Sequence, residues 1–223
     1  MKLLLLGHGR MGTLVEALAG EYGATIAGVV DEFTADAEAW PAADVAIDFT
    51  TAEALVTNLP RLASMGTNVV IGTTGWQAHE AGMRQVAERA GIGVVASANF
   101  SLGVNLFLAM VEQAAKLMQP HARYGAFLHE AHHAAKADAP SGTALMLRSA
   151  MEHVGYTHRV DVSSTRAGFI PGTHTIGFDG ASETITLTHE ARDRGAFARG
   201  ALEAARWVRG RRGWFTMRDV IGL

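Results

Sequence analysis

The sequence predicts an α/β protein in which a parallel-sheet domain is joined to a smaller α+β domain. Three observations predict this fold class. Short apolar segments alternate with helical patterns over the first hundred residues, a glycine-rich turn follows the first apolar segment, and the pattern changes near Gly103. At 223 residues the chain is long enough for one large domain or two small ones.

The first half alternates strands with helices. Strands are expected at 2–6, 25–30, 45–49, 68–71 and 93–96, and helices at 11–19, 52–65 and 78–90. Strands that alternate with helices in this way form a parallel sheet with right-handed crossovers.

The second half has a different pattern. Helices are expected at 104–118, at 142–153 behind the capping pair Pro140-Ser141, and at 197–209. Extended segments are expected at 123–130, 159–166, 174–178 and 183–189. The last of these alternates polar and apolar residues, as a half-exposed antiparallel strand does.

Composition excludes several classes of protein. Hydrophobic residues make up 48% of the chain and charged residues 18%, which rules out intrinsic disorder. There is no cysteine, so disulfides, thiolate catalysis and cysteine-held metal centres are excluded. No apolar run approaches the roughly 20 residues that cross a bilayer, and the first residues lack a signal-peptide pattern. With a net charge of −3, we expect a cytoplasmic protein with no membrane or nucleic-acid partner.

A glycine-rich turn, Gly7-His8-Gly9-Arg10-Met11-Gly12, joins the first strand to the first helix. This G-x-G-x-x-G pattern is weak evidence alone, but between a strand and a helix it is typical of a Rossmann-type dinucleotide site. Gly7 permits the tight turn, Gly9 lets the backbone approach a pyrophosphate, and Gly12 allows close packing of helix and strand. The alternative is an ordinary tight turn. Asp31 argues against it, because a carboxylate at the end of the second strand is placed to bind the adenosine ribose.

The residue after Asp31 also bears on the cofactor. Glu32 stands there rather than a basic residue, and two carboxylates repel the 2′-phosphate of NADPH. NADH is therefore the expected cofactor, with NADPH as the alternative because Arg10 offers a positive charge.

Two more loops follow predicted strands, at the sheet edge where open α/β sheets bind ligands. They are Gly72-Thr73-Thr74-Gly75 and Ser97-Ala98-Asn99-Phe100. We expect Gly72, Thr73, Thr74, Ser97, Ala98, Asn99 and Phe100 to bind the cofactor. The alternative is that both are ordinary connecting loops.

Two histidines and a lysine fall within one short segment, residues 130–144. His132 and Lys136 can transfer protons near neutral pH if their pKa values are tuned, and the chain has only three lysines. Gly142 and Thr143 begin a predicted helix, where free backbone N–H groups suit a carboxylate. The alternative is a chance pair of surface histidines.

The same segment contains an H-E-x-x-H run, His129 to His133, which is a zinc-peptidase signature. That signature requires a helix, whereas the preceding residues indicate a strand, on which the two histidines would lie roughly 13 Å apart. No third ligand is evident. We therefore expect no metal and keep a zinc hydrolase as an outside alternative.

Taken together, these motifs resemble the dihydrodipicolinate reductase family, the 4-hydroxy-tetrahydrodipicolinate reductases of lysine and diaminopimelate biosynthesis. The resemblance covers almost the whole chain and is most specific at 130–144. The supporting matches are Gly7–Gly12, Gly72–Gly75, Ala98–Gly103 with Asn105, Arg166-Ala167-Gly168, Gly172 with His174, and Met217–Val220.

The resemblance implies a role for each matching residue and an NAD(P)H-dependent reduction. His132 would be the proton donor or acceptor and Lys136 the second proton donor. His133, Gly142 and Thr143 would bind the substrate, a small cyclic dicarboxylate. The family fold implies a dinucleotide-binding domain at 1–103 and 194–223, a substrate-binding and oligomerisation domain at 104–193, and a homotetramer.

Three other functions fit the sequence less well. An aspartate dehydrogenase on the same fold would leave the 136–143 segment without a purpose. A semialdehyde dehydrogenase needs a catalytic cysteine, which the chain lacks. An NAD-binding sensor without activity would not need paired histidines and a lysine.

Overall fold

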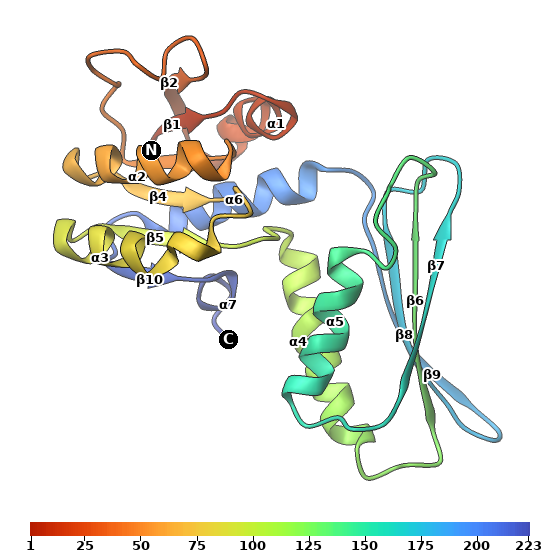
Figure 1. Ribbon diagram of the computed structural model, residues 1–223. Helices are drawn as coiled ribbons and strands as arrows, with labels where there is room; N and C mark the ends of the chain where they lie inside the picture. Colours follow the sequence, from red (N-terminus) through yellow and green to blue (C-terminus); the bar gives the residue numbers. More distant parts are fainter. The chain divides into compact units, whose positions relative to one another are not determined.

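Six short strands from the two ends of the chain form one parallel sheet (Figure 1). The structure is a computed structural model that describes residues 1–223. The strands are β1 (Lys2–Leu6), β2 (Thr25–Val30), β3 (Val45–Asp48), β4 (Asn68–Ile71), β5 (Gly93–Ala96) and β10 (Gly213–Phe215), arranged in the order β10-β5-β4-β3-β1-β2. The strand order reverses between β1 and β3, and ligands of open α/β sheets bind at such a switch point.

Helices cover both faces of this sheet because its strands are apolar on both sides. Leu3 and Leu5 of β1 belong to the core beneath α1 and α6, whereas Leu4 and Leu6 belong to the core beneath α2 and α3. The helices of this part are α1 (Arg10–Leu18), α2 (Ala52–Ser64), α3 (Glu80–Ala90), α6 (Gly195–Val208) and α7 (Met217–Val220), with short 3₁₀ segments at Ala19–Tyr22 and Gln77–His79.

A second sheet has four strands in the order β7-β6-β8-β9. They are β6 (Gly125–His132), β7 (Val160–Arg166), β8 (Thr173–Asp179) and β9 (Thr184–Glu190). Strand β6 runs parallel to β7 and antiparallel to β8. Helices α4 (Leu102–Met118) and α5 (Gly142–His153) lie side by side on one face of this sheet and bury a separate apolar core there (Figure 1).

The chain divides into two compact units, Met1–Leu102 with Gly195–Leu223, and Gly103–Arg194. The predicted fold class is confirmed, since a parallel sheet between helices is joined to a smaller mixed α+β unit. Each predicted strand and helix is present with ends shifted by a few residues, but β10 and α7 were not predicted. No helix combines the length and the apolar character needed to cross a membrane.

Candidate active site

The turn between β1 and α1 requires glycine at two positions. Gly7 has a φ of +84°, and a Cβ there would lie 2.8 Å from the carbonyl oxygen of Phe49. A Cβ on Gly12 would lie 2.2 Å from the carbonyl oxygen of Gly7, so any side chain there would push helix and turn apart. Space around Gly9 is open, which leaves its backbone accessible to a ligand. These contacts give the role expected of each glycine a physical basis.

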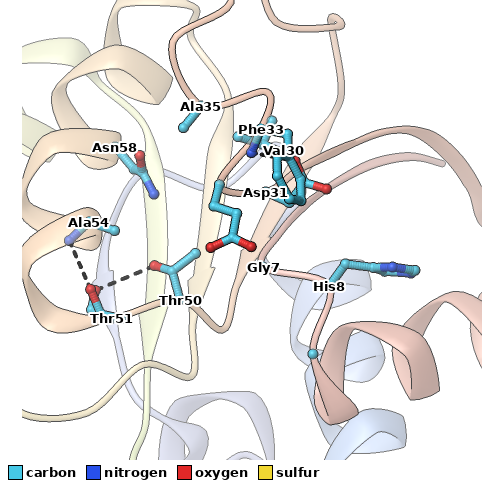
Figure 2. A pocket seen from close by; sticks show the side chains of 12 residues that line it. Gly7, His8, Val30, Asp31, Phe33, Ala35, Thr50, Thr51, Ala54 and Asn58 are labelled. Carbon is cyan, nitrogen blue, oxygen red and sulfur yellow. Dashed lines mark hydrogen bonds between the residues drawn. The ribbon is translucent and has the colours of Figure 1, made fainter.

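A pocket of about 520 Å³ opens beside this turn. It is lined by Gly7, His8, Gly9, Val30, Asp31, Glu32, Phe33, Ala35, Thr50, Thr51, Ala54 and Asn58. Figure 2 shows Thr50, Thr51 and Asn58 on one side of the pocket and Gly7 and Asp31 on the other. The pocket therefore joins the ends of β1, β2 and β3, and its glycine turn and carboxylates suit the adenosine part of a dinucleotide.

Asp31 follows the last residue of β2, and its carboxylate is held in place locally. Its Oδ1 accepts hydrogen bonds from the backbone N–H groups of Phe33 and Thr34, each at 3.1 Å, and from the Thr34 hydroxyl at 2.8 Å. The bond from the Thr34 hydroxyl is the main cause of a lowered Asp31 pKa, so the side chain stays ionised. Because these three bonds converge on Oδ1, Oδ2 is left for a ligand hydroxyl.

A buried carboxylate that was not assigned from the sequence, Asp48, organises the same edge of the sheet. It is fully buried at the end of β3. Its Oδ1 accepts hydrogen bonds from the Thr50 hydroxyl at 2.6 Å and the Thr73 hydroxyl at 2.8 Å, and its Oδ2 accepts one from Asn58 at 3.2 Å. Asp48 thus links the loop after β4 to two residues of the pocket.

The other predicted cofactor residues lie along the same sheet edge. Arg10, Met11 and Gly12 form the first turn of α1, and Gly72, Thr73 and Thr74 follow β4. Ser97, Ala98, Asn99 and Phe100 follow β5, where the Ser97 hydroxyl donates to the Asn99 carbonyl at 2.8 Å. Two side chains have other contacts: the His8 ring lies 2.6 Å from a Glu16 carboxylate oxygen, and the Phe100 ring is buried in the core against Phe49.

The second unit places a charged cluster at the end of an apolar row. Alternate residues of β6 face the helices: Ala126 and Leu128 are buried in the core, and the next two of the row are Glu130 and His132. The register sets Glu130 opposite His174 of β8, and His132 beside Arg166 of β7. Strand pairing therefore assembles this cluster from residues far apart in the sequence.

Glu130 is fully buried and is bound from two sides. Arg166 donates one hydrogen bond to each carboxylate oxygen, at 3.0 and 2.6 Å, and Nδ1 of His132 lies in hydrogen-bond contact with the oxygen at the longer distance. Burial favours the neutral acid, but the bonds from Arg166, Ser164 and His132 outweigh it and lower the pKa of Glu130 to about 2. The carboxylate is therefore an anion and can only accept.

Burial also lowers the pKa values of the two histidines in the cluster. For His132 the hydrogen bond and negative charge of Glu130 partly oppose this effect. For His174 burial and the neighbouring charge of His132 lower the pKa to about 4. Both rings are therefore neutral at pH 7.

Lys136 and the start of α5 lie in the segment that follows β6. The Lys136 ammonium donates to the Asp138 carboxylate at 2.6 Å, and the Asp138 backbone carbonyl accepts a 2.6 Å bond from Arg166. Arg166 thus binds both Glu130, the partner of His132, and Asp138, the partner of Lys136. Ser141 caps α5 by accepting from the Ala144 N–H at 3.2 Å, which leaves Gly142 and Thr143 in the first turn. His133 comes directly after β6.

The predicted strand at the H-E-x-x-H run is confirmed, since His129 lies within β6. Its Nδ1 is 2.9 Å from the Ser163 hydroxyl, and the strand's alternation turns it away from Glu130 and His132. A different set of ligand atoms, from Glu130, His132 and His174, lies within 4.8 Å of one another and could reach one metal ion. Both Glu130 oxygens are engaged by Arg166, however, so a guanidinium already provides the positive charge there.

Three residues of this cluster, Glu130, Arg166 and His174, had no predicted role. A signal was available for Glu130, which stands two residues from His132 and so shares its face on a strand. For Arg166 and His174 the sequence offers no such signal, because only the register of the strands places them beside His132 and Glu130.

Comparison with known proteins agrees with this architecture. The family model described as the dihydrodipicolinate reductase N-terminus matches residues 1–100, and the one described as its C-terminus matches residues 103–221. This chain belongs to the dihydrodipicolinate reductase family.

Individual relatives span the chain from end to end. A protein named 4-hydroxy-tetrahydrodipicolinate reductase from Rhodopseudomonas palustris (strain BisA53) is 38% identical, over 100% of this chain and 97% of its own. One of the same name from Christiangramia forsetii is 32% identical, over 99% and 98%. The solved structure of dipicolinate-bound dihydrodipicolinate reductase from Paenisporosarcina sp. TG-14 has the same fold, with a TM-score of 0.82 and 20% identity over 99% of both chains.

Proposed function

We propose that this chain reduces 4-hydroxy-tetrahydrodipicolinate to tetrahydrodipicolinate with NAD(P)H, in lysine and diaminopimelate biosynthesis. Membership of the family supports the activity. The observation that carries it is the cluster of His132, Lys136 and the first turn of α5 within one compact unit, where Arg166 holds the partners of both proton-transfer groups. The glycine turn and pocket of the other unit support a dinucleotide-binding role for that unit.

The residues of the second unit have separate tasks in this proposal. The N–H groups of Gly142 and Thr143 bind one carboxylate of the cyclic dicarboxylate, and His133 contacts the ring substituents. The chemistry that NAD(P)H would supply when bound is hydride donation to the ring, after the 4-hydroxyl is lost as water. His132 and Lys136 transfer the protons that accompany the loss of water and the later protonation of the reduced ring.

We further infer that NADH is preferred over NADPH. Asp31 and Glu32 both line the pocket, and a 2′-phosphate placed near Asp31 would meet two negative charges. Arg10, in the first turn of α1, offers the 2′-phosphate one positive charge, so NADPH is kept as the weaker of the two cofactors. We also propose that the chain acts in the cytoplasm as a homotetramer assembled through its second unit.

The direct test is an assay of NADH and NADPH oxidation with the freshly made product of dihydrodipicolinate synthase. Oxidation of NADH that depends on this substrate is expected, with no reduction of NAD⁺ when aspartate is added. Turnover with aspartate, and none with the synthase product, would instead indicate an amino-acid dehydrogenase.

A further inference from the structure

The ring of His132 is oriented by a carboxylate, Glu130, that takes no part in the proton transfers themselves. Glu130 is fully buried and ionised, so its oxygen accepts from the ring nitrogen it contacts, and the proton of neutral His132 must sit on Nδ1. Nε2 then carries a lone pair. A side chain at position 172 would reach within 3.1 Å of Nε2, so Gly172 leaves the space beside that nitrogen open.

We propose that Glu130, clamped by Arg166, is a positioning residue that fixes His132 as the Nδ1–H tautomer and makes its Nε2 a proton acceptor at the start of the reaction. A carboxylate that orients a histidine and offsets its developing charge plays the same part in Ser-His-Asp enzymes. Lys136 is then the proton donor of the resting site. The inference rests on the proposed function only for the step that these two groups perform.

The protons balance when His132 accepts a proton from the substrate while Lys136 donates one to it. As the 4-hydroxyl leaves, Nε2 of His132 takes a proton from the adjacent ring carbon, and Lys136 protonates the hydroxyl so that water departs. Hydride addition then gives a ring anion, and the His132 imidazolium returns its proton to that carbon. Lys136 regains its proton from solvent. The negative charge of Glu130 stabilises the imidazolium in the interval between the two transfers.

The surroundings of His132 support this assignment. The groups that face it are Glu130 on its own strand, Arg166 on β7, His174 on β8 and Lys136 in the following segment. Glu130 is the anion among them. The ring centroids of His132 and His174 are 5.1 Å apart, and Nε2 of His174 lies 3.0 Å from the Ser141 hydroxyl while its Nδ1 makes no hydrogen bond. His132 is therefore the histidine that is bonded to the Glu130 carboxylate.

Glu130→Gln is the variant that tests the proposal. A glutamine amide keeps the shape but loses the negative charge, and its NH₂ group meets an N–H of Arg166 in either orientation. Where the NH₂ group replaces the oxygen shared with His132, it donates to Nδ1 and moves the ring proton to Nε2. We expect kcat to fall between about 10-fold and 10⁴-fold. The Kd for NADH and for dipicolinate should change by less than about threefold, because neither ligand is proposed to touch Glu130. The matched control is Glu183→Gln, which alters a carboxylate bonded to Tyr124 at the opposite end of β6 and should leave kcat unchanged.

Two further readouts separate positioning from mere structural support. In the wild-type protein, ¹⁵N spectra of labelled histidine, with His132 assigned from a His132→Gln spectrum, should show a protonated Nδ1 and an unprotonated Nε2. The kcat profile of Glu130→Gln should also have its acidic limb at lower pH, because the charge of Glu130 raises the His132 pKa against the effect of burial. Loss of structural support alone would lower kcat without moving the acidic limb.

A wild-type His132 protonated on Nε2 at pH 7 would overturn the proposal, even if Glu130→Gln fails to fold. So would a folded Glu130→Gln protein with wild-type kcat and an unshifted pH profile. If the wild-type protein does not reduce the dipicolinate substrate at all, the proposed function fails. The tautomer seen in the spectra would still decide the role of Glu130.

Discussion

The hydroxyl oxygen of Ser141 caps helix α5 and also lies 3.0 Å from Nε2 of His174 on strand β8. Both side chains are buried, so one oxygen joins the start of the helix to the sheet beneath it. Ser141→Ala should therefore remove an N-cap and leave a buried histidine nitrogen without its partner. We expect a loss of unfolding free energy of about 2–4 kcal/mol, measured from the midpoint of urea denaturation.

Thr51→Ala is the matched control for this prediction. Thr51 caps α2 by accepting from the Ala54 N–H at 3.3 Å, and it is exposed. Its removal should cost about 1 kcal/mol, the usual value of a cap alone. Equal losses for the two variants would show that the bond between Ser141 and His174 adds nothing to stability.

The pH dependence of stability should report on His174. Its pKa is lowered to about 4 in the folded protein, mainly by burial, whereas the pKa of an exposed histidine is about 6.5. Above pH 6.5 neither the folded nor the unfolded state binds this proton. As pH falls from 6.5 to about 4 the unfolded state binds it first, so stability declines. The contribution of this residue amounts to about 3 kcal/mol over that window.

Urea midpoints of the wild-type and His174→Gln proteins between pH 7 and pH 4 would measure this contribution. The variant should show the shallower decline, and His153→Gln, which removes an exposed histidine, should follow the wild type. His132 and His189 also have lowered pKa values, so some slope should remain in every protein. A His174→Gln curve parallel to that of the wild type would contradict the assignment.

Much of the fold follows from local patterns that the sequence displays. The run Lys2–Leu6 is apolar at every position but the first, which marks a strand buried on both faces, and Gly7 ends it with a left-handed turn. Strand β10 was missed for the opposite reason. It has three residues, too few for a periodic pattern, and it exists because it pairs with β5 about 120 residues earlier.

The same distinction between local patterns and long-range strand pairing applies to the candidate site. His132 and Lys136 stand out by residue type, and Gly142 by its place after a capping serine. Glu130 was missed because the predicted strand ended at residue 130, whereas β6 continues to His132 and gives both side chains the same face. The pairing of Glu130 with His174 depends on the register of two strands in the folded sheet, which no local pattern encodes.

Cofactor preference should change with a single charge reversal. Glu32→Arg replaces a carboxylate of the pocket with a guanidinium that can bind a 2′-phosphate. We expect kcat/KM for NADPH to rise by about 10-fold or more, relative to that for NADH. Steady-state oxidation of the two cofactors at saturating substrate would measure the change.

Glu38→Arg is the control for long-range charge, because Glu38 is exposed in the same loop and does not line the pocket. Its ratio of kcat/KM for NADPH to that for NADH should stay close to that of the wild type.

Asp31→Ala should weaken NADH binding by about 10-fold or more through loss of a charged hydrogen bond to the ribose. A wild-type protein with equal or higher kcat/KM for NADPH would contradict the inferred preference.

The effects of His132 and Lys136 on kcat can be compared with those of another histidine and another lysine of the same unit. His133→Gln should act mainly on KM for the dicarboxylate, since this histidine is proposed to bind rather than to transfer a proton. Lys116→Met removes an exposed lysine of α4 and should leave both kcat and KM unchanged.

The most direct test of the account is kcat for NADH oxidation with 4-hydroxy-tetrahydrodipicolinate, measured for His132→Gln and for Lys136→Met. Each variant should lose about 10²–10⁴-fold in kcat, the usual weight of a positioned proton-transfer group, while the Kd for NADH stays within about twofold of the wild type. If both variants keep near-wild-type kcat, the cluster around Glu130 does not carry the chemistry and the assignment of the active site is wrong.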